Sequence, residues 1–148
     1  MENLKNDPAQ SISAPGPYDA DPRDFSCRCG CGFNSPSPRM VELLNKLSNT
    51  IRERVIINSG CRCETHNYKV GGKPKSFHLT GEAADICSRK MDALTLGISA
   101  FNAGFIGIIV YKNFVHIDVR RRRCMELNVH LFDNPEEEVS ENEKKAEA

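Results

Sequence analysis

Residues 105–119 read FIGIIVYKNFVHIDV, two apolar stretches separated by a short polar pair. We expect strands over residues 106–111 and 114–119, joined by a tight turn at Lys112 and Asn113 as in a β-hairpin. In the second stretch apolar and polar residues alternate, so His116 and Asp118 are predicted to project from the same face of the strand. This segment therefore predicts an antiparallel sheet with two polar side chains on one surface.

The residues before this hairpin alternate between helical and extended patterns. Apolar side chains recur at helical spacing over residues 38–51, and a second amphipathic helix is expected over residues 91–103, ending before a glycine. Residues 54–58 and 82–87 are predicted strands, whereas residues 61–76 contain Gly and Pro without periodicity and are expected to form a long loop. Together these patterns predict an α+β fold with a mainly antiparallel sheet flanked by helices.

Composition divides the chain into three parts. Residues 1–24 are rich in Pro, Asp, Asn and Ser and are expected to form a flexible N-terminal leader. Residues 133–148 are strongly acidic and are expected to form a disordered tail. The folded domain is therefore predicted over residues 25–132, an ordinary size for one hydrophobic core.

Charge and hydropathy argue against two classes of partner. Lys plus Arg and Asp plus Glu both number 20, so no net field favours nucleic acid or a membrane surface. The longest nearly apolar run, residues 105–111, is far too short to cross a bilayer. The N-terminus has no basic segment followed by an apolar one, so we expect synthesis in the cytoplasm without a signal peptide.

The seven cysteines are unevenly spaced, which is not typical of a secreted disulfide framework. Cys27, Cys29 and Cys31 occupy alternate positions and could hold a structural zinc together with Cys61 or Cys63. Their spacing is not the Cys-x-x-Cys of a zinc knuckle, and free or partly paired thiols are the alternative. The sequence leaves this question open.

Histidines and carboxylates offer a second possible metal site. His78 precedes Asp85 by seven residues, and a tight turn at Thr80 and Gly81 would bring their side chains together. With His116 they would form a set of three ligands that leaves a fourth zinc position open, as in catalytic zinc sites. Such a spacing also occurs by chance in proteins without a metal.

Several segments carry a more specific pattern: NSGCRC at residues 58–63, SFHLTGEAADI at residues 76–86 and FVHID at residues 114–118. Over residues 25–120 the chain resembles the zinc D-alanyl-D-alanine carboxypeptidase family, in particular its bacterial and phage murein peptidases. The resemblance implies a hedgehog/DD-peptidase-like fold and Zn²⁺ held by His78, Asp85 and His116. It also implies that Arg62 steadies the substrate carbonyl and its developing oxyanion, and that Ser76 is a hydrogen-bonding group for substrate.

One position departs from the family pattern. Well-studied members carry Glu or Asp three residues before the last His ligand, as the general base, and here that position is Asn113. An amide cannot accept a proton at useful pH. The nearest carboxylate on the same predicted strand face is Asp118, which is either the base or a group that orients His116.

The resulting hypothesis is a zinc metallopeptidase that hydrolyses amide bonds in peptidoglycan stem or cross-link peptides. It would act either as a D,D-carboxypeptidase or as a murein endopeptidase of the endolysin type. We expect a monomer whose partners are peptidoglycan peptides, with no membrane or nucleic-acid partner, acting on the cell wall after phage- or prophage-type release. The alternatives are a non-catalytic zinc domain that binds wall peptides or a protein, and a nucleic-acid module built on the cysteines and the basic run at residues 120–123.

Overall fold

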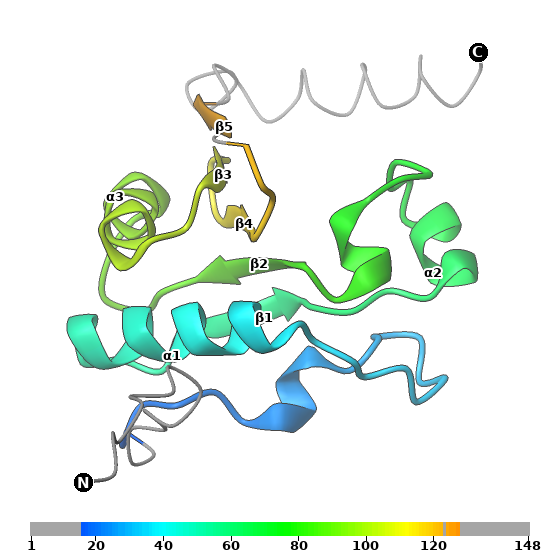
Figure 1. Ribbon diagram of the computed structural model, residues 1–148, viewed down its shortest axis with the longest axis horizontal. Coiled ribbons are helices and arrows are strands. Elements are labelled where there is room, and N and C mark those ends of the chain that lie inside the picture. Colours follow the sequence, from blue (N-terminus) through cyan, green and yellow to red (C-terminus); the bar gives the residue numbers. More distant parts are fainter. Residues whose placement is uncertain (1–15, 123, 128–148) are drawn as a thin grey trace, which may run out of the picture.

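The computed structural model describes residues 16–122 and 124–127 and shows an α+β fold. Helices and strands alternate along most of the chain (Figure 1). The helices are α1 (Pro38–Ile51), α2 (Glu64–Lys69) and α3 (Ala93–Ala103), with 3-10 turns η2 (Pro22–Phe25) and η3 (Phe77–Thr80). The strands are β1 (Ile56–Ser59), β2 (Ala83–Cys87), β3 (Gly107–Val110), β4 (Val115–Asp118) and β5 (Cys124–Leu127).

The five strands form one sheet in the order β1-β2-β4-β3-β5. The first three pairings are antiparallel, which confirms the predicted mainly antiparallel sheet and the hairpin of β3 with β4. Strand β5 was not predicted from the sequence, and it pairs in parallel with β3 at the edge of the sheet. Edge strands are held by backbone hydrogen bonds, such as the 2.7 Å bond from Cys124 N to Ile106 O, and need no alternating side-chain pattern.

Both long helices occur where periodicity predicts them. Helix α1 buries the apolar face that contains Met40, Leu44 and Leu47, and the residue after its end, Arg52, adopts the left-handed conformation. Helix α3 begins at Ala93 rather than at the predicted residue 91, because the Asp92 side chain caps it by accepting a 2.7 Å hydrogen bond from Thr95 N. The two helices contact each other and share one core with the sheet (Figure 1).

The predicted loop over residues 61–76 is wrong in one part, because Glu64–Lys69 forms helix α2. Cys63 caps this helix through its sulfur, which accepts a hydrogen bond from His66 N at 3.4 Å. Within α2 only Asn67 is buried, and Tyr68 is 86% exposed. A short helix without an apolar face gives no periodic signal in the sequence.

Residues 16–20 lie along α1, and the 3-10 turn η2 that follows contacts β1. The side chains of Asn45 and Asn49 accept hydrogen bonds from Ala20 N and Tyr18 N, and Phe25 is buried in the core. These contacts fall within the predicted leader and at its border with the folded domain. Residues 1–15 of the leader and the predicted acidic tail lie outside the described residues. Among the described helices, none has the length and apolar character needed to span a membrane.

Candidate metal centre

The polar face of the sheet is built by the pairing of β2 with β4. Asp85 lies directly opposite His116 in the antiparallel register. Their sequence neighbours Ala84, Ile86 and Ile117 are fully buried in the core on the other face. The alternation that predicted a polar surface on this strand thus brings a carboxylate from β2 against an imidazole from β4.

His78 reaches the same point from the turn before β2. It lies in η3, where the Ser76 hydroxyl accepts a hydrogen bond from His78 N at 3.3 Å. Gly81 then adopts the left-handed conformation, with φ of 71°, and directs the chain into β2. The turn expected at Thr80 and Gly81 is present, and it brings His78 back against Asp85.

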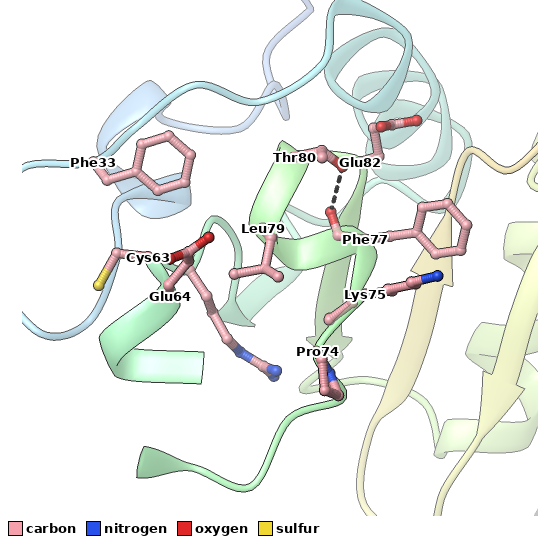
Figure 2. A pocket seen from close by; sticks show the side chains of 11 residues that line it. Phe33, Cys63, Glu64, Pro74, Lys75, Phe77, Leu79, Thr80 and Glu82 are labelled. Carbon is pink, nitrogen blue, oxygen red and sulfur yellow. Dashed lines mark hydrogen bonds between the residues drawn. The ribbon is translucent and has the colours of Figure 1, made fainter. Parts of the chain in front are cut away.

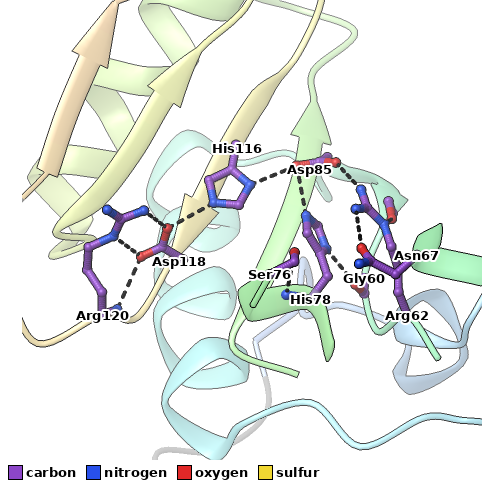
Figure 3. A network of polar contacts seen from close by, with 10 residues as sticks. Gly60, Arg62, Asn67, Ser76, His78, Asp85, His116, Asp118 and Arg120 are labelled. Atoms are coloured by element: carbon purple, nitrogen blue, oxygen red, sulfur yellow. Dashed lines mark hydrogen bonds and ion pairs between the residues drawn. The ribbon is translucent and has the colours of Figure 1, made fainter. Parts of the chain in front are cut away.

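Three ligand atoms converge at Asp85 (Figure 3). Asp85 Oδ1 lies 3.3 Å from His78 Nε2 and 3.1 Å from His116 Nδ1. All three atoms lie within 4.8 Å of one another. Burial alone would raise the pKa of Asp85, but hydrogen bonds from His116 and His78 in their protonated forms outweigh that effect and hold the pKa below its ordinary value.

In each histidine one ring nitrogen faces Asp85 and the other, the outer nitrogen, faces away from it. The hydrogen-bond partner of the outer nitrogen determines whether the nitrogen that faces Asp85 carries a proton. His78 Nδ1 lies 2.7 Å from the carbonyl oxygen of Gly60, which can only accept, so Nδ1 carries a proton. His116 Nε2 lies 2.9 Å from Asp118 Oδ2 and is likewise the donor to a carboxylate. In the neutral rings, the lone pairs of His78 Nε2 and His116 Nδ1 then face Asp85 Oδ1. This donor set fits a divalent cation such as Zn²⁺.

Asp118 contacts the His116 nitrogen that faces away from Asp85. The carboxylate is fully buried, and Arg120 binds it through Nε, at 2.7 Å from Oδ1, and through Nη2. Burial would raise the pKa of Asp118, whereas the hydrogen bonds from Arg120 and His116 lower it well below its ordinary value. Gly107 lies opposite Asp118 on β3, and a Cβ there would collide with the side chains of Asp118 and Arg120.

Arg62 binds the other oxygen of Asp85. Its Nη2 lies 3.1 Å from Asp85 Oδ2, and it also donates to Asn67 Oδ1 at 3.3 Å and to Ser59 Oγ at 3.0 Å. The guanidinium carries five N–H donors, so two remain after these three contacts. Arg62 was predicted as a site residue from its motif, but its partners Ser59 and Asn67 were not, because the fold is what brings their side chains to it.

A pocket of about 710 Å³ lies beside Arg62 and Ser76 (Figure 2), and none of the three ligand residues is among the described residues that line it. Its lining includes Arg62 and Ser76, the two predicted substrate-binding residues, together with Glu64, Phe77 and Glu82. Asn113 instead lines a different cavity beside Cys87. The structure thus brings His78, Asp85, His116 and Arg62 together with Ser76 nearby, and it places Asn113 apart from this pocket.

A family model described as Peptidase M15 matches residues 21–118, more than half of the chain. The chain belongs to the peptidase M15 family. This match confirms the resemblance to the zinc D-alanyl-D-alanine carboxypeptidases, and the α+β fold is compatible with it. A search of curated proteins found no significant match.

The family is one of zinc-dependent metallopeptidases of the cell-wall type, so at that level a peptidase with a zinc cofactor is supported for this chain. The observed donor set, two imidazoles and a carboxylate, is consistent with that cofactor. Arg120, which the sequence analysis treated only as part of a basic run, turns out to belong to this centre through Asp118. Arg120 follows Asp118 by two residues, and this spacing is the feature of the sequence that could have predicted their ion pair.

Proposed function

We propose that this protein hydrolyses amide bonds in peptidoglycan stem or cross-link peptides, with Zn²⁺ held by His78, Asp85 and His116. The observation that supports this most is the convergence of two imidazole lone pairs on one carboxylate oxygen beside a pocket lined by a cation. Zinc in such a site supplies a Lewis acid that polarises an amide carbonyl and lowers the pKa of a water molecule to about 7.

Arg62 then has two functions in the proposed reaction. Its contact with Asp85 Oδ2 holds that carboxylate with Oδ1 toward the histidines. Its two remaining N–H donors are available to the carbonyl oxygen of a substrate in the adjoining pocket, where negative charge develops during hydrolysis. Ser76 lines the same pocket, and its hydroxyl proton is available as a donor to a peptide carbonyl.

The geometry favours Asp118 as the group that orients His116, and not as the general base. Both of its oxygens are engaged by Arg120 and one also by His116, and the carboxylate lies on the far side of the imidazole from Asp85. A carboxylate on the outer nitrogen of a metal-binding histidine fixes the tautomer and the ring orientation. Glu64 and Glu82, the carboxylates that line the pocket beside Arg62, are then the candidates for proton transfer that substitution has to test.

A non-catalytic zinc domain that binds wall peptides is the second candidate function. One specific observation favours it: neither Asn113 nor Asp118 can act as a base at the centre, because one lines another cavity and the other is buried in ion pairs. In that case the pocket would bind a peptide without cleaving it.

Mass spectrometry of muropeptides separates the two functions. Purified peptidoglycan is incubated with the zinc-loaded protein, with chelator-treated protein and with chelator-treated protein resupplied with zinc. We expect new peptide fragments in the first and third reactions only, and their masses identify the cleaved bond. Glu64→Gln and Glu82→Gln, tested in parallel, identify the base by loss of turnover with zinc retained.

Binding of peptidoglycan without any new fragment would contradict the peptidase and favour the binding domain. His66→Ala is the matched control for a His78→Ala variant. His66 lies in α2 and is not one of the three ligand residues, so its removal should leave hydrolysis unchanged while His78→Ala abolishes it.

A further inference from the structure

Four cysteines from two distant segments form a second cluster in the described part of the chain. Cys27, Cys29 and Cys31 lie in the turn before α1, and Cys63 is the residue that caps the N-terminus of α2. Their sulfur atoms all lie within 4.8 Å of one another. We propose that these four thiols bind a structural zinc ion, separate from the one at His78, Asp85 and His116.

The distances between the sulfurs fit a tetrahedral metal site. Cys27 Sγ lies 3.4 Å from Cys29 Sγ and 3.8 Å from Cys63 Sγ, and Cys29 Sγ lies 3.6 Å from Cys63 Sγ. A tetrahedral zinc with bonds of about 2.3 Å to sulfur separates its ligands by about 3.8 Å. The sulfurs of a disulfide lie about 2.05 Å apart. Three sulfurs thus form one face of a tetrahedron, and Cys31 provides the fourth corner.

The backbone around the cluster is shaped for this arrangement. Gly30 and Gly32 have φ of 83° and 86°, and these left-handed residues fold the Cys-x-Cys-x-Cys segment back on itself. Backbone N–H groups point at three of the sulfurs: Cys63 N at Cys27, Phe33 N at Cys31 and His66 N at Cys63, each at 3.4 Å. Such donors stabilise the thiolate form, and a zinc site needs its cysteines deprotonated.

The structure also separates Cys63 from Cys61, which the sequence left as alternatives. The Cys61 side chain is 2% exposed and packs in the hydrophobic core, whereas Cys63 points at the turn that carries the other three cysteines. All four thiols would lose their protons on binding, and the Zn(Cys)₄ unit would carry two negative charges.

A zinc ion here would connect the N-terminal segment to the peptidase site. Cys63 follows Arg62 directly, and Arg62 N donates to His78 O at 3.0 Å. Phe33 and Cys63 also line the pocket beside Arg62. By tying residues 27–31 to residue 63, the metal would fix the wall of the pocket and the backbone that carries Arg62 without touching a substrate.

The zinc content of the purified protein tests the proposal. We expect about two zinc ions per chain in the unaltered protein and about one in a Cys29→Ser/Cys31→Ser variant. The side chains of Cys29 and Cys31 are exposed, so the substitutions remove no core packing. Cys87→Ser is the matched control, since Cys87 lies outside the cluster, and it should retain both ions. Equal zinc content in the double variant and the control would overturn the proposal.

Cobalt substitution gives a second readout that does not depend on the folding of the double variant. Co²⁺ in a site of four thiolates gives intense ligand-to-metal charge transfer in the near ultraviolet, which histidine and carboxylate ligands do not produce. We expect this band in the unaltered protein and in a His78→Ala variant, so failure of the peptidase site would leave it intact. Absence of the band, or a mass deficit showing a disulfide between these cysteines in the protein as isolated, would contradict the proposal.

Discussion

The two candidate metal centres are held together in different ways. His78, Asp85 and His116 are supported by strand pairing and by hydrogen bonds that hold the ring of His78 to Gly60 and the ring of His116 to Asp118, which Arg120 binds in turn (Figure 3). The four cysteines lie outside the sheet, and within the described part of the chain the hydrogen bonds of their sulfurs run to backbone N–H groups and to one another. We therefore expect the first centre to keep its shape without metal and the second to depend on the metal for its shape.

The largest effect is expected from removing a ligand of the first centre. Asp85→Ala deletes the carboxylate on which both histidines converge and removes the ion pair of the Arg62 guanidinium. Lewis-acid stabilisation by a metal contributes several kcal/mol, so hydrolysis of peptidoglycan peptides should fall by about 10³-fold or more. Cobalt absorption from the thiolate site should be unchanged, which a fragment assay and a spectrum on the same sample will show.

Loss of the thiolate site should lower the free energy of unfolding, and its effect on hydrolysis should be smaller than that of Asp85→Ala. At free zinc a thousand times above the dissociation constant, binding to the folded state alone stabilises it by about 4 kcal/mol. Denaturant unfolding of the Cys29→Ser/Cys31→Ser variant should show a loss of this order in zinc and no loss relative to the unaltered protein in chelator. An equal loss in both conditions would mean that the cysteines stabilise the fold without a metal.

Asp118→Asn separates orientation from proton transfer. If Asp118 orients His116, the variant should bind zinc at the first centre about 10–100-fold more weakly, and kcat should recover at saturating zinc. If Asp118 is the base, kcat stays low however much zinc is added. Titration of hydrolysis against free zinc distinguishes the two results.

Gly107→Ala tests the same support from the neighbouring strand. A methyl group at residue 107 would displace the side chains of Asp118 and Arg120, so the His116 ring would lose part of its restraint. We expect weaker zinc binding at the first centre, by no more than the effect of Asp118→Asn, with zinc retained by the cysteines. Unchanged affinity at the first centre would show that Asp118 is not needed to position the imidazole.

The smallest effect is expected at Glu53, which belongs to neither centre. Its carboxylate accepts hydrogen bonds from Ser88 Oγ and Arg89 N. Burial would raise the pKa of Glu53, but these bonds lower it below its ordinary value of about 4.3.

The carboxylate therefore contributes stability above that pH, and the contribution is lost as the pH falls through the lowered pKa. Glu53→Gln should cost about 1 kcal/mol near neutral pH and less in acid, with or without zinc. A zinc-dependent change in the unfolding curves of this variant would show that the stability readout is not specific to the cysteines.

Local patterns predicted the parts of this molecule that depend on local geometry. Alternation in residues 114–119 gave the shared face of His116 and Asp118, and the turn before β2 gave the approach of His78 to Asp85. Contacts between neighbouring strands could not be predicted in this way, because the register of each pair depends on the whole sheet. Nothing near Gly107 in the sequence indicates that it makes room for Asp118. Similarly, Cys61 and Cys63 look equivalent until the fold buries one and leaves the other to cap α2.

X-ray absorption at the zinc edge can examine both centres in one protein. In the Cys29→Ser/Cys31→Ser variant we expect zinc surrounded by nitrogen and oxygen only, with the multiple scattering of two imidazoles. In the unaltered protein sulfur neighbours at about 2.3 Å should be added. Zinc with only sulfur neighbours in the unaltered protein, and none bound to the variant, would contradict a metal at His78, Asp85 and His116.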